Sequence, residues 1–435
     1  MSGLFLPESK KLTNGGAHRC NDCMRKNLKR RRYLKGVAVG ASSAALAGCI
    51  GGSGGGGGGS GLQEDWEAEE MAPVPAKSHP ELLEPTEAEL DASTTVSHLT
   101  WAGYDGENVQ QPFREQFDAN TSLDLFTEDP QAINRLSAGE WKQFDIFTPN
   151  NAFIADAVEE DLLRPLDEES WRPYTFDNYL DLFKPENGYK YGHVNEDGEF
   201  DTDGQLYALP QRWGWVSMCV NLDTVPESDW NSYDIAWSDK YNVGLSDWFF
   251  WMVQVIMLRE GIDPFKEHSD DEIEQVKQST FDLFDNAKAI YPDVASQNQA
   301  LKSGEIDILL MSSNFGQGTL RRDGRMEFKN VIPDEGGIIW VEEDSFLKGE
   351  LSPLADNYVA YMQTPEAAYN LSWPTGASSV NVVPHASAFD QYTDEQKEVL
   401  RTEDLDDILA NSVFFDGVPD LESFQPMWRQ AKARM

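Results

Sequence analysis

The residues near the amino terminus have the types and order needed for one covalent modification, the attachment of lipid to a cysteine thiol. Cys49 ends the sequence LAGC, which matches a lipobox, and an apolar run over residues 36–47 precedes it. Arg30 and Arg31 stand ahead of that run in the arrangement of a twin-arginine export signal. The run is too short to span a bilayer but suits a signal h-region. We therefore predict a lipoprotein signal peptide over residues 1–48, with lipid on Cys49.

The segment after Cys49 has the composition of a spacer. Glycine dominates residues 51–59, and an acidic, proline-bearing stretch follows. Such sequences bury too little apolar surface to fold, so residues 49–94 are predicted to form a flexible tether. Met24 offers a second start, which would make residues 1–23 an artefact of start-site choice.

Patterns that would indicate catalysis or metal binding are weak. The histidines after the tether are scattered and form no H-E-x-x-H sequence, and Cys20-x-x-Cys23 lacks the second ligand pair of a zinc site. The 75 acidic residues are too many for the sequence to single out a catalytic pair. We predict no enzyme activity, no cofactor and no metal. A secreted hydrolase or glycosidase with carboxylates in a cleft remains the alternative.

The charge of the chain restricts its partners. Its 435 residues carry 75 acidic and 35 basic side chains, a formal net charge of −40. Such a surface repels nucleic acid and anionic lipid. Disorder would be the usual explanation, but 40% hydrophobic residues with 13 Trp and 22 Phe suffice for a core. An acid-rich surface over an ordinary core indicates a halophilic protein that stays hydrated in concentrated salt.

Short apolar strands alternate with amphipathic helices from residue 95 onward, which predicts an α/β fold. The Ser269 and Glu272 pair predicts a capping box, and Thr364-Pro365 predicts a helix start. The predicted strands are 96–101, 145–148, 206–209 and 216–221, the last two framing a tryptophan-rich turn, and the predicted helices are 110–120, 247–259 and 269–290.

Five short motifs occur in an order that resembles the spermidine/putrescine-binding proteins, extracellular solute-binding proteins of ABC transporters in the type II periplasmic-binding-protein superfamily. The similar segments are Trp101-x-x-Tyr104, residues 144–149 (FDIFTP), residues 207–221 with their YALP and WG sequences, residues 303–306 (SGEI), and residues 332–340 (IPDEGGIIW).

The resemblance implies two α/β lobes with a ligand held in the cleft between them. Lobe 1 would contain residues 95–212 and about 341–385, and lobe 2 would contain residues 213–340 and about 386–435. In this family aromatic rings enclose an amine and carboxylates hold its ammonium groups. Carried over by motif, the ligand-binding residues would be Trp101, Tyr104, Trp213, Trp340 and Glu342.

The sequence departs from the family where an acidic pair is expected, because Trp248 and Trp251 stand there instead. Three residues apart, they would share one face of a helix, and we predict that both bind the ligand. A further binding tryptophan of the family aligns with Ser312. These changes favour a weakly charged or quaternary organic amine over spermidine. The alternative is that the two tryptophans only pack the second lobe and that the ligand is not an amine. From the signal peptide we predict an exported protein, anchored by Cys49 to the outer face of the cytoplasmic membrane. The resemblance implies ABC permease subunits as its partners, and we expect a monomer.

Overall fold

The computed structural model describes residues 94–374 and 380–435, so Arg30, Arg31 and Cys49 lie outside the described residues. The strands are β1 (Thr95–Thr100), β2 (Asn120–Leu125), β3 (Ile146–Phe147), β4 (His193–Val194), β5 (Gln205–Leu206), β6 (Ala208–Asn221), β7 (Val243–Ser246), β8 (Ala289–Tyr291), β9 (Ile308–Ser313), β10 (Phe328–Val331), β11 (Gly337–Phe346) and β12 (Ser412–Phe414).

The α-helices alternate with these strands along most of the chain. They are α2 (Glu107–Phe117), α3 (Asp129–Ser137), α4 (Ile154–Glu159), α5 (Glu168–Trp171), α6 (Phe249–Arg259), α7 (Asp270–Asn286), α8 (Val294–Ser303), α9 (Asn314–Arg322), α10 (Ala355–Met362), α11 (Pro365–Ser372), α12 (Asp394–Leu400), α13 (Leu405–Ala410) and α14 (Gln425–Lys432). Short 3₁₀ helices include η4 (Asn151–Phe153), η7 (Asp181–Phe183) and η11 (Ala386–Gln391). None of the helices within the described ranges is both long and apolar enough to cross a membrane.

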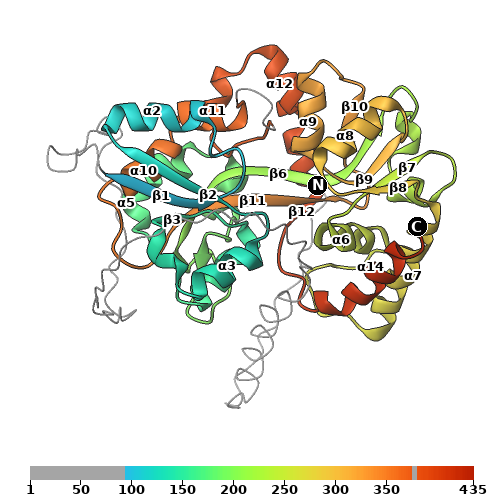
Figure 1. The fold of residues 1–435 in the computed structure, drawn as a ribbon, viewed down its shortest axis with the longest axis horizontal. Helices are drawn as coiled ribbons and strands as arrows, with labels where there is room; N and C mark the ends of the chain where they lie inside the picture. Colours follow the sequence, from blue (N-terminus) through green and yellow to red (C-terminus); the bar gives the residue numbers. More distant parts are fainter. Residues whose placement is uncertain (1–93, 375–379) are drawn as a thin grey trace, which may run out of the picture.

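One sheet of ten strands runs through the described part of the chain, in the order β2-β1-β3-β11-β6-β9-β7-β8, with β10 paired to β6 and β12 to β11. The long antiparallel strands β6 and β11 cross from one half of the molecule to the other (Figure 1). β3 pairs with the end of β11 at Ser345 and Phe346, whereas β9 pairs with the far part of β6. Two groups of strands are therefore joined by one central ribbon.

The register shows that the two groups of strands point toward each other. β1 and β3 are parallel to each other and antiparallel to β11, so they run in the direction of β6. β9 is antiparallel to β6, and β7 is parallel to β9. The carboxyl ends of β1 and β3 therefore face those of β7 and β9. In open α/β sheets ligands bind outside such strand ends.

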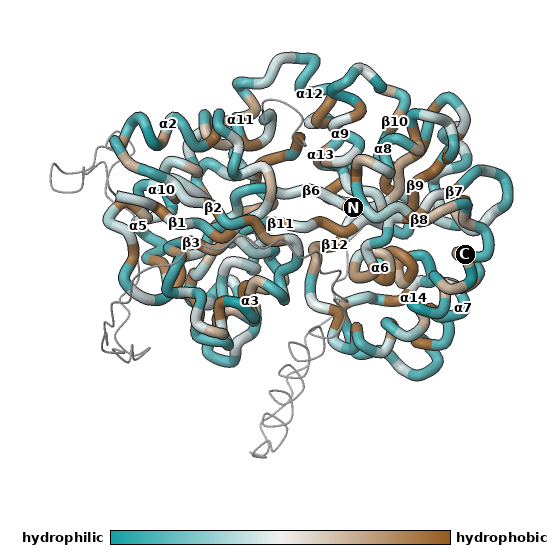
Figure 2. The backbone as a smooth tube through the Cα atoms, in the orientation of Figure 1, coloured by the Kyte–Doolittle hydropathy of each residue, from teal (hydrophilic) through white to brown (hydrophobic). Residues whose placement is uncertain are grey.

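Helices cover both faces of the sheet and enclose separate apolar cores. In one half α2, α10 and α11 lie on one side and α3 on the other; in the second half α8 and α9 lie opposite α6, α7 and α14 (Figure 1). The core under α3, α6, α7 and α14 is distinct from the core under α2, α10 and α11. The hydropathy of the residues agrees with this layered arrangement, because hydrophobic residues lie along the strands and hydrophilic residues lie in the outer loops (Figure 2).

The α/β prediction is confirmed, and so are both helix starts. Ser269 and Glu272 form the reciprocal capping box of α7, and the Thr364 hydroxyl accepts from Ala367 ahead of Pro365. Three boundaries were wrong. Residues 206–221 are mostly one strand, because pairing on both sides keeps the tryptophan-rich segment extended. Residues 289–290 belong to β8 and not to α7, and α2 ends at Phe117 where Asp118 turns left-handed.

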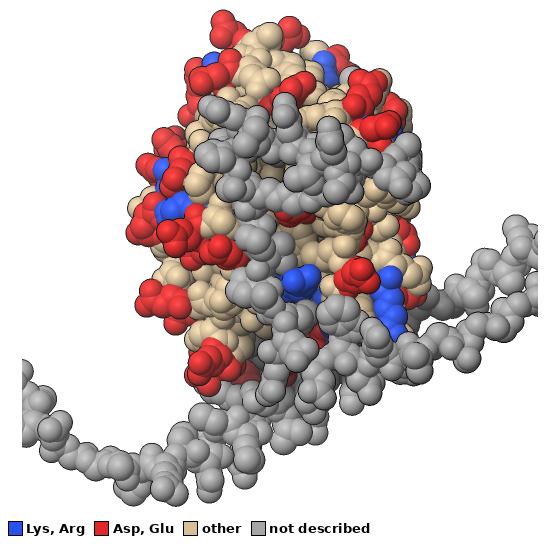
Figure 3. Space-filling model, turned by 90° about the vertical axis from the view of Figure 1, so that its left-hand side faces the viewer, with Lys and Arg blue, Asp and Glu red and all other residues tan. Residues whose placement is uncertain are grey.

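The predicted lobe boundaries near residues 212 and 340 fall inside β6 and β11, the two strands that cross. Helix α12 packs against α9 and α14 against α7, whereas η11 packs against α11. The lobe assignment of the carboxyl-terminal residues remains a prediction. On the face shown in Figure 3, Asp and Glu side chains far outnumber Lys and Arg.

Candidate functional site

Loops at the facing strand ends hold several residues that the sequence singled out. Trp101 follows β1 directly, and Trp248 follows β7 after one intervening residue. Phe315 lies in the first turn of α9, directly after β9. Asn150 follows β3, and its backbone bridges to Glu342 of β11. We call the set Trp101, Arg212, Trp248, Phe315, Trp340 and Glu342 the strand-end site.

A buried ion pair lies at the centre of the strand-end site. Arg212 of β6 stands opposite Glu342 of β11. Its Nε donates to Glu342 Oε2 at 2.7 Å and its Nη2 donates to Oε1 at 2.9 Å, so the contact is bidentate. Both residues are at most 6% exposed. Burial alone would lower the pKa of Arg212, but the Glu342 carboxylate raises it overall.

The same arginine fixes the loop after β1. Arg212 Nη1 and Nη2 donate to the carbonyl of Ala102 at 3.2 and 3.3 Å, and the guanidinium lies over the Tyr104 ring at 4.7 Å. The loop that carries Trp101 is thereby held against the crossing strands. The role predicted for Glu342, as the charged partner of an amine, remains a prediction, but its carboxylate already has a cationic partner.

Gly214 allows three parts of the site to approach one another. It pairs with Trp340 across the two crossing strands. A Cβ at this position would lie 2.1 Å from Asn314 Oδ1 and 2.6 Å from the Trp340 ring, too close for any side chain. The space is needed because Asn314 Oδ1 accepts a hydrogen bond from the backbone of Trp215 at 3.0 Å. The absence of a side chain at this glycine of the WG sequence therefore lets α9 pack against β6.

The aromatic rings of the site form two groups. The Trp248 ring stacks on Phe315 with centroids 6.3 Å apart, and Phe315 meets Trp340 edge-on at 6.0 Å. On the opposing strand ends Trp101 packs against Phe126 at 4.3 Å. The indole N–H groups of Trp101 and Trp340 are buried and have no acceptor in the structure. Both can donate to a ligand.

Trp251 has different neighbours from Trp248. Trp248 is the N-cap residue of α6, with φ −114° and ψ 82°, so it is not helical and the three-residue spacing does not place the two rings on one helical face. Trp251 packs against Phe415 at 4.5 Å. Phe415 also contacts Phe153 at 6.0 Å. The ring of Trp251 therefore belongs to a cluster at the junction of the two halves.

Tyr104 and Trp213 are fully buried. Trp213 packs between Phe183 and Trp215, with centroids at 5.3 and 6.1 Å, in the core under α2, α10 and α11. Because side chains alternate along a strand, Trp213 lies on the face of β6 opposite to Gly214. Their ligand-binding role was predicted from motif position, which does not show the face a strand residue takes.

Position 312, where the related proteins have a further tryptophan, has a packing role. Met311 has φ +53° and forms a bulge in β9, where the register with β6 shifts. Ser312 is buried and its hydroxyl donates to Gln317, while Asn330 Nδ2 donates to the Ser312 carbonyl at 2.8 Å. This side chain thus packs toward α9 and β10.

Carboxylates that the sequence could not single out lie buried beside the strand-end site. The hydroxyl of Thr148 donates to Asp344 Oδ1 at 2.7 Å, and Tyr189 donates to Glu343. Burial raises the pKa of Asp344 to about 7 and that of Glu343 to about 8. Asp129, which accepts two hydrogen bonds from Asn150, has its pKa raised by burial to about 7.

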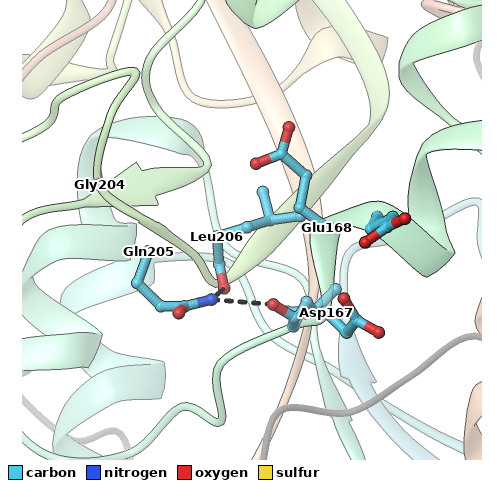
Figure 4. A pocket seen from close by; sticks show the side chains of 7 residues that line it. Asp167, Glu168, Gly204, Gln205 and Leu206 are labelled. Carbon is cyan, nitrogen blue, oxygen red and sulfur yellow. Dashed lines mark hydrogen bonds between the residues drawn. The ribbon is translucent and has the colours of Figure 1, made fainter.

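A separate open pocket lies away from the strand-end site, beside α5 and β5. Its acidic residues are Asp167, Glu168 and Glu169, and Gln205 closes one side by donating to the carbonyls of Leu166 and Leu206 (Figure 4). Within the described ranges there is no group of three or more His, Cys, Asp or Glu side chains placed to hold a metal ion. The pocket has no aromatic residue to receive an amine.

Two groups of strands joined by crossing strands, with aromatic residues at facing strand ends, define a two-part solute-binding protein. The family model for bacterial extracellular solute-binding proteins matches residues 112–394. The chain belongs to this family. Nothing supports the alternative of a hydrolase.

Solved structures show the same fold. A putative spermidine/putrescine ABC transporter protein from Listeria monocytogenes has 18% identity and a TM-score of 0.60, covering 79% of this chain and 100% of its own. The spermidine/putrescine ABC transporter substrate-binding protein of Streptococcus pneumoniae has 16% identity and a TM-score of 0.59, with 78% and 99% coverage. A lipoprotein of Treponema pallidum has 14% identity and a TM-score of 0.59, also with 78% and 99% coverage. No curated protein matches the chain.

Proposed function

We propose that this protein is the substrate-binding component of an ABC importer, which captures a small solute between its two halves and delivers it to permease subunits. The observation that carries the proposal is the strand-end site, where loops after β1, β7 and β9 meet the crossing strands. Ligand sites of α/β proteins lie at such strand ends. The names of the structural relatives support the transporter assignment.

The solute is an organic amine with little net charge. The faces of Trp101, Trp248 and Trp340 suit a weakly hydrated cation, and a desolvated cation–π contact contributes about 2 kcal/mol. Because Arg212 already neutralises Glu342, the strand-end site offers no uncompensated carboxylate of its own. A polyamine would lose its hydration without gaining a counter-charge. A quaternary amine loses little hydration, and an amine with an acid group in the same molecule brings its own counter-charge.

The location follows from the sequence. The lipobox, the twin-arginine pattern and the glycine-rich spacer support an exported protein whose lipid on Cys49 holds it at the outer face of the cytoplasmic membrane. A spacer of about 45 residues would let the folded part reach a permease from that anchor.

Mass spectrometry of small molecules released from the purified protein tests the function directly. We expect one stoichiometric organic amine. Titration of tryptophan fluorescence in high salt with spermidine, putrescine and a quaternary amine then ranks the ligand classes. A response to the quaternary amine alone supports the proposed class. Tight spermidine binding contradicts it. If no cation gives a response, the ligand is not an amine, and the identity of the released small molecule then tests the transporter proposal.

A further inference from the structure

A second small pocket lies at the crossing strand β6, beside Trp215. It lies between β6, α9, β10 and the end of α12, and it has room for about one water-sized particle. The polar residues around it that matter here are Trp215, Gln317, Arg321, Asn330 and Arg401.

Two buried guanidinium groups give this pocket an excess of positive charge. Arg321 donates to three backbone carbonyls, including that of Glu398 at 2.9 Å, and forms no ion pair with any residue that the structure describes. Arg401 donates to Asp404 at 2.8 Å, and Lys329 also reaches Asp404 at 3.5 Å. Burial lowers the pKa of Arg321 and of Arg401, because Asp404 and the more distant Glu398 compensate for them incompletely.

The pocket also contains hydrogen-bond donors without acceptors. The indole Nε1 of Trp215 and the amide Nε2 of Gln317 are buried and unpartnered. The orientation of the Gln317 amide is set by its oxygen, which accepts from the Ser312 hydroxyl. Asn330 Oδ1 is an unpartnered acceptor at the same pocket, since its Nδ2 donates to the Ser312 carbonyl. A buried donor without a partner destabilises the folded state, so a bound acceptor at this place would stabilise it.

We propose that this pocket binds a small monovalent inorganic anion of halide size. Trp215 Nε1 and Gln317 Nε2 would donate to the anion, and Arg321 and Arg401 would supply the countercharge. A single water would satisfy the donors and Asn330 Oδ1 but would leave the buried positive charge uncompensated. Larger oxyanions do not fit the space. The proposal does not rest on the identity of the solute or on the proposed transport role.

Bromide is the probe for a direct test, because its anomalous scattering distinguishes it from water. Crystals of the protein soaked in sodium bromide should show an anomalous peak within hydrogen-bond distance of Trp215 Nε1 and Gln317 Nε2. Density for water alone, without an anomalous peak, overturns the proposal.

Gln317→Glu provides a solution test, since it keeps the acceptor for Ser312 and replaces the donor Nε2 by a carboxylate oxygen, which adds a fixed negative charge beside the anion position. Wild-type protein should have a higher thermal midpoint in chloride or bromide than in gluconate at equal ionic strength. In Gln317→Glu this difference should vanish, and the midpoint in gluconate should equal or exceed that of wild type.

The matched control is Gln254→Glu, which also replaces a buried glutamine by a carboxylate. Gln254 lies in α6, and its side-chain amide donates to the carbonyl of Phe250 and not to or from an arginine. Its midpoint should fall in every salt. If Gln317→Glu falls as far as Gln254→Glu, or keeps the preference for chloride, the pocket is not an anion site.

Discussion

At the scale of single residues, Arg212 and Glu342 determine what charge the strand-end site presents. Each is at most 6% exposed, and a buried charge is stable only when a partner compensates it. Their bidentate contact leaves no net charge, and Arg212 also holds the loop at Ala102. The pair therefore determines both the ligand charge that the site accepts and the position of Trp101.

Arg212→Gln should convert the site to one that accepts cations. The glutamine keeps a donor for the Ala102 carbonyl but leaves the Glu342 carboxylate without its countercharge. We expect affinity for putrescine to rise at least tenfold, about 1.4 kcal/mol, while unfolding free energy falls by about 3–5 kcal/mol. Isothermal titration in high salt measures the affinity.

The double variant Arg212→Gln/Glu342→Gln is the control, because it removes both charges. It should lose the gained affinity while keeping a similar shape at the site. Equal putrescine affinity in wild type and Arg212→Gln would show that the pair does not select ligand charge.

Glu343 should make the protein less stable as pH rises. Its pKa is raised from 4.5 to about 8 by burial, so between these values the folded state holds a proton that the unfolded state has lost. Stability from this group is complete below pH 4.5 and is lost as pH rises through 8. Glu343→Gln should flatten that slope and add roughly 1–4 kcal/mol at pH 9. Urea denaturation from pH 5 to 9 measures it.

The control for this measurement is Glu196→Gln, at an exposed turn. It replaces an exposed glutamate by glutamine, so it shows what the loss of one surface carboxylate does to the pH slope when no burial is involved. An identical pH slope in Glu343→Gln and Glu196→Gln would contradict the assignment to burial.

At the scale of elements, β6 and β11 form the surface on which the site is built, and Gly214 permits their contact with α9. Gly214→Ala should displace Asn314 and the Trp340 ring, since the new Cβ would lie 2.1 and 2.6 Å from them. We expect a loss of about 1–3 kcal/mol in stability and at least tenfold in solute affinity. Gly417→Ala is the control, because nothing lies within 4 Å of its Cβ position. Equal behaviour of the two variants in denaturation and binding would contradict the close approach.

Local signals in the sequence were sufficient for elements whose causes are local. The capping box at Ser269 and the helix start at Thr364 were predicted correctly because a few neighbouring residues determine them. The continuous strand β6 was not, since its extended form depends on β11 and β9, which lie more than 80 residues further along the chain.

Dependence on residues far apart in the sequence also limited the prediction of the site. The motifs located Trp101 directly after β1 and Trp340 within β11, but nothing local shows that Trp213 faces a core while Gly214 faces Trp340. Arg212 stands beside the WG motif and was missed, because its partner Glu342 lies 130 residues away and only sheet register brings them together.

At the scale of the whole molecule, replacing the sulfur atom of Cys49 by oxygen tests whether lipid attaches the chain to the membrane. Cys49→Ser replaces the thiol of the lipobox. We expect the protein to move from the membrane fraction to the medium, because the folded part has no bilayer-spanning helix within the described ranges. Stable anchoring by lipid takes two chains or more. Immunoblots of both fractions measure the effect, and retention of the variant in the membrane would contradict the anchor.

The net charge of −40 should make stability depend strongly on salt. The Debye length falls from about 30 Å at 0.01 M to about 3 Å at 1 M, so repulsion among acidic groups is screened only in concentrated salt. Folding brings these charges closer together, and the folded state therefore gains more from screening than the unfolded state. We expect the thermal midpoint to rise by roughly 10 °C, or about 3 kcal/mol at 2–4 °C per kcal/mol, between 0.01 and 1 M. Because screening depends on ionic strength, most of this rise should also occur in gluconate, which separates it from the smaller chloride effect expected of the anion pocket. A midpoint that stays level across this range in both salts would show that repulsion among the acidic groups does not limit stability.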